Sequence, residues 1–192
     1  MDEKPISTCS EDSCQDCTIH SRINCHFSLW QLIRFYIFVM PSFIIGGIGV
    51  ENYSSLFLFI WIAIIGIFFM FIEIRILCSH CPHYGEPGKT LSCWANYGAP
   101  KIWRFRPEPM SFPEKFVLIQ GFIIIWGYPV IFMILSRHWF LLIGYLVSVL
   151  LFFFALEKLY CRICMNLSCP FNCVDKETKE RFLANNPHIK IR

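Results

Sequence analysis

The sequence has little charge, since aspartate, glutamate, lysine and arginine together make up 16% of its residues. Ordinary soluble domains carry about 25% charged residues. Hydrophobic residues make up 55% of the chain, and 20 residues are phenylalanine. Too little polar material remains to cover that much apolar surface, so the composition excludes an ordinary soluble globular domain.

The sequence also lacks the motifs of common catalytic and nucleotide-binding sites. It contains no glycine-rich phosphate-binding loop and no G-x-S-x-G nucleophile motif. Its hydrophobic stretches carry almost no ionisable residue near their centres, which argues against a proton-coupled pump or an ion pathway. We therefore predict no catalytic residue.

Four long hydrophobic blocks separate the polar segments. A helix rises about 1.5 Å per residue, so about 20 residues cross a hydrocarbon core of about 30 Å. Backbone polar groups in lipid must be satisfied internally, so each block should be a helix. The blocks span residues 29–49, 56–77, 116–135 and 139–160. The predicted fold class is therefore an all-α integral membrane protein with four transmembrane helices.

The distribution of basic residues predicts the orientation. An even number of spans places the amino-terminal segment, the middle loop and the tail on one side of the membrane. The lysines and arginines concentrate in these three segments, and only Arg137 lies on the far side. Arg34 and Arg75 lie near the same-side ends of their helices, where long side chains reach the interface. The positive-inside rule then predicts a multi-pass cell-membrane protein with cytoplasmic amino and carboxy termini.

This topology divides the chain into five segments. A cytoplasmic cysteine-rich segment (1–28) precedes the first transmembrane hairpin (29–77), and a second hairpin (116–160) precedes a cytoplasmic cysteine-rich tail (161–192). Between the hairpins lies a cytoplasmic loop rich in cysteine, aromatic and basic residues (78–115). All 11 cysteines fall in the cytoplasmic segments. The cytoplasm keeps thiols reduced, so metal ligands or redox-active thiols are expected there, whereas the reversed orientation would favour disulfides.

The second and fourth spans end alike, which indicates an internal repeat. Glu73 precedes a C-x2-C motif at 78–81, and Glu157 precedes a C-x2-C motif at 161–164. This spacing predicts two parallel helical-hairpin repeats, each followed by a C-x2-C turn, with the repeat axis along the membrane normal. Coincidence is the alternative explanation.

The two motifs predict a metal site at the membrane surface. A C-x2-C turn lets two sulfurs face one ion at about 2.3 Å, and a parallel repeat would bring both turns together. The predicted tetrathiolate ligands are Cys78, Cys81, Cys161 and Cys164. The tail adds Cys169 and Cys173, which with the 161–164 motif could chelate a metal without the middle loop.

The amino-terminal segment carries a second set of candidate metal ligands. They are Cys9, Cys14, Cys17 and Cys25. The first three have plant-type ferredoxin spacing, C-x4-C-x2-C, but a small zinc knuckle or a flexible tail with redox-sensitive thiols explains the same residues. Thiolates favour zinc, iron–sulfur clusters or cuprous copper. We expect zinc first, because structural zinc needs no other machinery, and an iron–sulfur cluster second.

The middle loop alternates aromatic, basic and proline residues from Trp94 to Lys115. Arg104 and Arg106 are candidate binders of an anionic cofactor or ligand. The alternative is that aromatic and basic residues lie at the level of the lipid headgroups. The expected partners are the lipid bilayer and a membrane or cytoplasmic protein. No nucleic acid is expected for a basic patch so close to the membrane.

The tail after Cys173 is predicted to form a short polar helix from Asp175 to Ala184. Asp175 is placed to cap its amino terminus, and Asn185-Asn186-Pro187 to end it. Nothing catalytic is expected there.

Three stretches resemble a group of small cysteine-rich prokaryotic membrane proteins. They are C-x2-C-P-x-Y at 78–84, A-N-Y-G-x-P-K-x-W at 95–103 and C-x2-C-x4-C-P at 161–170. The resemblance covers most of the chain after the first helix. It implies the same four-helix layout and no particular activity.

Together these patterns predict an integral membrane protein that binds zinc or an iron–sulfur cluster through cytoplasmic cysteine clusters. One alternative is a membrane redox or electron-transfer component with reactive thiols or iron–sulfur clusters. Another is a protein that handles or transports metal ions.

Overall fold

The computed structural model describes residues 4–15 and 17–190. In this part of the chain every regular element is helical, and there is no strand. The α-helices are α1 (Leu29–Glu51), α2 (Ser55–Ile67), α3 (Glu73–Ile76), α4 (Pro82–Gly85), α5 (Phe112–Leu135), α6 (Trp139–Ala155) and α7 (Lys176–Asn185). Shorter segments are the π-helical η1 (Phe68–Ile72) and η3 (Leu156–Cys161) and the 3-10 helix η2 (Cys78–His80).

Four helical stretches among the described residues are long and apolar enough to cross a membrane. They are Leu29–Glu51, Ser55–His80, Phe112–Leu135 and Trp139–Cys161. The second consists of α2, η1, α3 and η2 in sequence, and the fourth consists of α6 and η3. The prediction of an all-helical chain with four candidate membrane-spanning helices is confirmed for the described residues.

The third span begins earlier than the hydrophobic pattern predicted, at Phe112 instead of residue 116. The reason is a capping box, in which the Ser111 backbone N–H donates to Glu114 Oε2 at 2.8 Å. Pro113 in the first turn needs no intrahelical partner for its nitrogen. These residues make the helix begin within the polar loop, before the apolar block.

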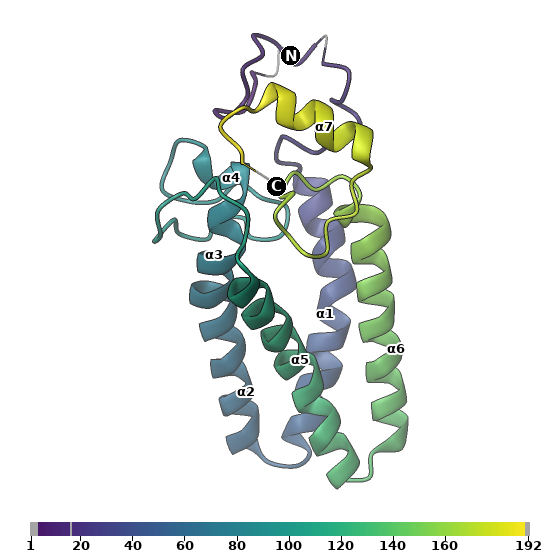
Figure 1. Ribbon diagram of the computed structural model, residues 1–192. Helices are drawn as coiled ribbons and strands as arrows, with labels where there is room; N and C mark the ends of the chain where they lie inside the picture. The colour runs from purple at the N-terminus through teal and green to yellow at the C-terminus, as the bar shows by residue number, and fades with distance from the viewer. Residues whose placement is uncertain (1–3, 16, 191–192) are drawn as a thin grey trace.

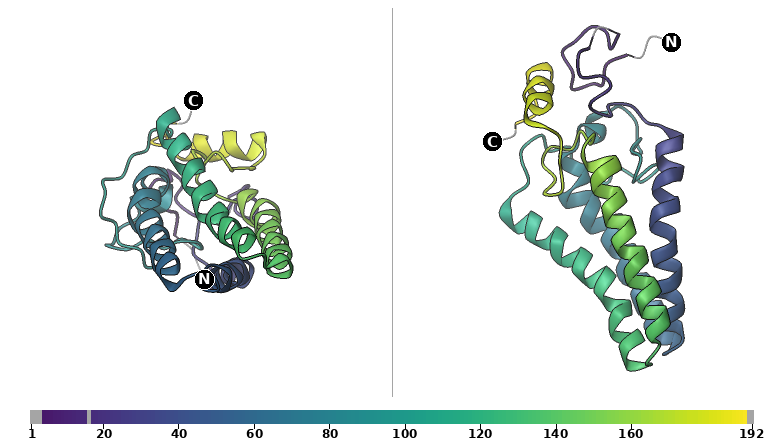
Figure 2. Two further views of the ribbon diagram at one scale, coloured as in Figure 1. Left: turned by 90° about the horizontal axis from the view of Figure 1, so that it is seen from below. Right: turned by 90° about the vertical axis from the view of Figure 1, so that its right-hand side faces the viewer.

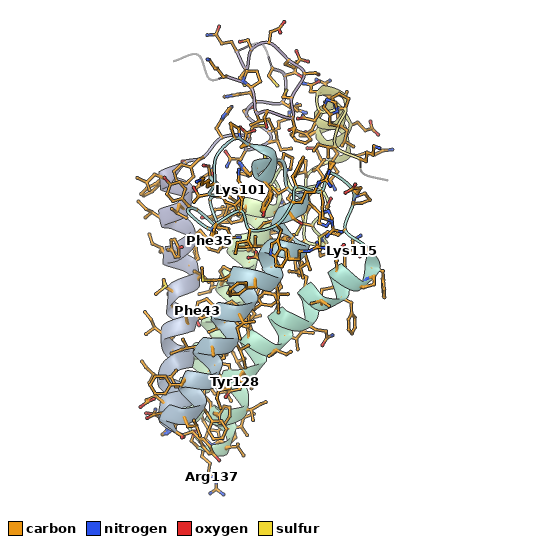
Figure 3. The ribbon with its side chains drawn as sticks, turned by 90° about the vertical axis from the view of Figure 1, so that its left-hand side faces the viewer. Phe35, Phe43, Lys101, Lys115, Tyr128 and Arg137 are labelled. Carbon is orange, nitrogen blue, oxygen red and sulfur yellow. The ribbon has the colours of Figure 1, made fainter. Side chains whose placement is uncertain are left out.

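The helices form a bundle that widens toward one end. Helices α1 and α6 lie side by side, whereas α5 diverges from them toward the end where it begins (Figures 1 and 2). The amino-terminal segment, the 78–111 loop and the segment from 162 to 190 gather at this wide end, which we call the cap (Figure 1). The far end has only the two short connections, and Figure 3 places Arg137 there, with Lys101 and Lys115 at the cap end.

Two buried polar side chains within the bundle are paired between helices. The indole Nε1 of Trp61 on α2 donates to the backbone oxygen of Ile125 on α5 at 3.0 Å. The hydroxyl of Tyr145 on α6 donates to the backbone oxygen of Trp126 at 2.8 Å. Such bonds satisfy groups that lipid cannot solvate, and they fix how α5 packs between its neighbours.

Glu114 connects the beginning of α5 to the cap end of the second span. Its Oε1 lies 2.6 Å from Arg106 Nη1 and 3.8 Å from Arg75 Nη1. Its Oε2 lies 3.6 Å from Nε2 of His80, whose side chain is fully buried. One carboxylate therefore faces three basic side chains from the loop and the second span.

Replacing Glu114 with glutamine is expected to destabilise the protein by about 2 kcal/mol, the scale of a hydrogen bond to a charged group. Glutamine can still accept the capping bond from Ser111, but it removes the charge that faces Arg106 and Arg75. Thermal unfolding in detergent micelles measures the effect. Glu108→Gln, an exposed carboxylate in the same loop, is the control and should unfold like the unmodified protein. Equal midpoints for both variants would contradict the prediction.

Candidate thiol-lined cavity

A cavity of about 370 Å³ is lined by residues from the cap-end halves of the spans and from the cap. Side chains from all four spans, from the 78–111 loop and from the segment after η3 line it. Six of these lining residues are cysteines: Cys78, Cys81, Cys93, Cys161, Cys164 and Cys169. The structure thus brings both C-x2-C motifs, 83 residues apart in the chain by their numbering, to one cavity.

A π-helical segment lies within each span that ends in a C-x2-C motif. Segment η1 precedes Glu73 in the second span, and η3 ends the fourth span at Cys161. A π-helical turn holds more residues than an α-helical turn, so it changes the direction in which the following side chains point. Such segments are frequent at functional sites. Here η1 precedes Cys78 and Cys81, whereas η3 ends at Cys161 and precedes Cys164.

Asparagine side chains of the tail bond to the end of the second span and to the tail itself. The amide of Asn166 donates to the backbone oxygen of Leu77 at 3.0 Å, and that of Asn172 donates to the backbone oxygen of Cys164 at 2.7 Å. The first bond joins the two C-x2-C regions directly. The tail cysteines are therefore positioned by one bond to a segment distant in sequence and by one bond within the tail.

Burial raises the pKa of the cap thiols. The pKa values of Cys81 and Cys164 lie well above the usual range, first because of burial and then because neighbouring thiolates repel. Burial also raises the pKa of Cys93, and it raises the pKa of Cys169 to about 11. Among the described residues that line the cavity there is no lysine or arginine. At neutral pH these thiols are protonated unless a cation stabilises the thiolate.

A carboxyl group and an amide lie beside the thiols. Glu73 is 6% exposed, and both of its carboxylate oxygens lie 3.2 Å from Asn96 Nδ2. The same nitrogen lies 3.2 Å from Cys78 Sγ, so Asn96 connects the carboxylate to the thiol. His83 also lines the cavity, and burial lowers its pKa to about 4, which leaves it neutral at pH 7. Glu157 differs from Glu73, since it is exposed and pairs with Lys158 at 2.9 Å.

The amino-terminal cysteines surround a second, much smaller cavity of about 20 Å³. Its lining includes Cys9, Cys14, Cys17, Cys25 and His20. Burial raises the pKa of Cys25 to about 12, and the other three cysteines add to the shift. The Sγ of Cys14 lies 3.6 Å from His26 Nε2. The structure therefore brings these four cysteines to the lining of one small cavity, apart from the larger cavity.

Three predicted site residues line neither of the two cavities. Cys173 is exposed, and its thiol donates to the backbone oxygen of Phe171 at 3.3 Å. Arg106 pairs with Glu114, and Arg104 is exposed on the loop. The anionic ligand at Arg104 and Arg106 stays a prediction.

Sequence reasoning missed Cys93 and Asn96 as members of this site. Cys93 has no partner cysteine at motif spacing, so no local pattern distinguished it. The neighbouring Trp94 stacks on Tyr160 at the end of the fourth span, with 4.6 Å between ring centroids. This stacking attaches the 93–96 stretch to the bundle. The signal for Cys93 was the aromatic Trp94 beside it, and Asn96 lies in the A-N-Y-G-x-P-K-x-W stretch that carries the resemblance.

The thiols do not form a metal site as the structure stands. Within residues 4–15 and 17–190, no group of three or more histidine, cysteine, aspartate or glutamate side chains is arranged to hold a metal ion. Five predicted ligands line the large cavity and four line the small one, but neither set of described sulfurs is arranged around one ion. Metal binding therefore requires the thiols to move toward a bound centre.

Comparison of the chain with protein-family models, with curated proteins and with solved structures finds no match. The two cysteine-lined cavities are therefore the observations that bear on the function of the protein.

Proposed function

We propose that this protein is a multi-pass cell-membrane protein that binds a metal centre through the thiols of its large cavity on the cytoplasmic side. The observation that carries the proposal is the meeting of six cysteines, from the middle loop and the tail, around a single cavity. The concentration of lysine and arginine in the cap segments supports the cytoplasmic orientation.

The chemistry of the lining favours a cation. A bound metal replaces the protons of thiols whose pKa burial has raised, and it balances thiolate charge that no lysine or arginine in the described lining balances. Thiolates select soft metals such as zinc or the iron of a cluster. The neutral His83 can also serve as a nitrogen ligand.

The size of the large cavity favours a cluster over a single ion. A site for one water molecule needs about 10–15 Å³, far less than this cavity offers. An iron–sulfur cluster held by four cysteines fits such a space better than one zinc ion. We therefore propose that the protein is a membrane redox component. The small amino-terminal cavity of about 20 Å³ suits a single ion, so we assign zinc to Cys9, Cys14, Cys17 and Cys25.

The duplicated-hairpin interpretation is part of the same proposal. Its support is that each span leading to a C-x2-C motif contains a π-helical segment. The different surroundings of Glu73 and Glu157 would then be a divergence of the two copies, with the first copy keeping the buried carboxyl group.

Anaerobic purification in detergent, followed by elemental analysis, acid-labile sulfide determination and an absorption spectrum, tests the proposal. We expect iron and sulfide in equal amounts, a visible charge-transfer band and about one zinc ion per chain. Zinc in both sites without iron would keep metal binding and remove the redox form. A colourless protein without zinc, iron or copper would overturn the proposal.

A further inference from the structure

The large cavity has one carboxyl group in its described lining, that of Glu73. This residue lies near the cap end of the second span, and it is 6% exposed. Ionisable residues within a membrane span are rare, face the interior of the bundle and mark sites that bind or move ions. The place of Glu73 therefore calls for a partner that accounts for its burial.

No cationic side chain among the described residues is that partner. The described lining includes no lysine or arginine, and Glu73 forms no ion pair with any described residue. By contrast, the exposed Glu157 of the fourth span pairs with Lys158 at 2.9 Å. Buried charges are paired within the protein or coordinate a metal. A charged Glu73 therefore needs a cation from outside the chain.

The hydrogen bonds around Glu73 leave acceptors in excess. Asn96 Nδ2 lies 3.2 Å from both carboxylate oxygens and 3.2 Å from Cys78 Sγ. This amide nitrogen carries two hydrogens, whereas a carboxylate alone offers about four acceptor sites. No other hydrogen bond reaches the carboxylate from the described residues. Most of its lone pairs are therefore available to a cation.

The carboxylate lies near thiols from three segments of the chain. Asn96 links it to Cys78 at the end of the second span. The pKa values of Cys93, from the middle loop, and Cys169, from the tail, are raised first by burial and also by the charge of Glu73. One cation bound among these groups would balance the carboxylate and the thiolates together. The surroundings of Glu73 thus match those of the proposed metal centre.

We propose that Glu73 is an oxygen ligand of the metal centre in the large cavity, with its carboxylate in one of four ligand positions and cysteine thiolates in the other three. The inference rests on the proposed metal centre and replaces one thiol of its four-cysteine form. A carboxylate oxygen is a harder ligand than a thiolate. In an iron–sulfur cluster it would therefore distinguish one iron from the others, and that iron would exchange its protein ligand most readily.

Elemental analysis of the anaerobically purified full-length protein tests the proposal. Glu73→Gln keeps the size of the side chain and an acceptor for Asn96 but removes the charged ligand. The iron of the large cavity, or its zinc, should therefore fall at least tenfold. Glu157→Gln, the exposed counterpart in the fourth span, is the control and should keep the full metal content. Glutamine also imitates a protonated carboxyl group, so full metal content in Glu73→Gln would overturn the proposal.

X-ray absorption at the metal edge separates a ligand from a residue that only supports the fold. The unmodified protein should show one oxygen neighbour closer to the metal than the sulfurs, since zinc–oxygen bonds of about 2.0–2.2 Å are shorter than zinc–sulfur bonds of about 2.3 Å. Glu73→Cys supplies a thiolate instead, so it should keep the metal and show one sulfur more and the oxygen lost. Identical spectra of the two proteins, or only sulfur around the metal of the unmodified protein, would refute this inference alone. An unmodified protein without metal in the large cavity would refute the metal centre itself.

Discussion

Replacing Cys164 with alanine is expected to remove the metal centre of the large cavity. This thiol lies close enough to Cys81, Cys93 and Cys169 for their charges to raise its pKa. A bound centre would therefore use it as a ligand from the tail. Elemental analysis should show a loss of more than tenfold in iron, or in the zinc of this site, while the amino-terminal zinc remains.

Two further variants test whether both C-x2-C motifs hold the same metal centre. Cys81→Ala removes a thiol from the middle loop and should cause the same loss if both C-x2-C motifs hold one centre. Cys173→Ala removes an exposed thiol from the tail and should keep the full metal content. Retention of metal in Cys81→Ala alone would assign the centre to the tail. Full metal content in both Cys81→Ala and Cys164→Ala would contradict a shared site.

The metal affinity of the unmodified protein is expected to depend on pH. Burial holds the pKa of Cys81 and Cys164 well above neutrality, so the metal-free thiols keep their protons at pH 7. Each thiol that becomes a ligand releases a proton, and metal affinity must therefore rise with pH and fall on acidification.

Replacing Gly121 with alanine is expected to destabilise the bundle strongly. A Cβ atom at this position of α5 would lie 1.8 Å from Cε2 and 2.5 Å from Cδ2 of Phe68. Phe68 is 4% exposed within η1, so its ring cannot turn away without displacing its neighbours. Such overpacking costs about 1–3 kcal/mol, more than the gain of about 1 kcal/mol that alanine brings to a helix.

Gly127→Ala is the matched control on the same helix, because a Cβ atom there meets nothing within 4 Å. It should unfold at the same temperature as the unmodified protein or slightly above it. Thermal unfolding followed by tryptophan fluorescence in detergent compares the two variants. A Gly121→Ala protein as stable as the control would show that α5 does not pack closely against the π-helical segment of the second span.

Local patterns gave the elements of the fold correctly. Membrane spans depend on the length of an apolar run, which the sequence displays directly. The tail helix α7 begins after Asp175, whose side chain accepts from Thr178 N at 2.9 Å, and its cap was readable from residue type. The predicted start of α5 was too late because it rested on hydrophobicity alone. Ser111 and Glu114 form the capping box that sets the observed start.

The sequence by itself determined that the chain has four helices long and apolar enough to span a membrane and that most of its cysteines lie between and beyond them. The structure places Cys78 and Cys161 in the last turns of the second and fourth of these helices, which the hydrophobic pattern had ended before them. Only the tertiary structure decided that Cys93 joins the two motifs, that Cys173 stays outside and that Glu73 is buried while Glu157 is exposed. Helix formation and apolar length are properties of neighbouring residues. Which side chains meet in a cavity depends on how the spans diverge and how distant cap segments bond to each other, and neighbouring residues do not encode that.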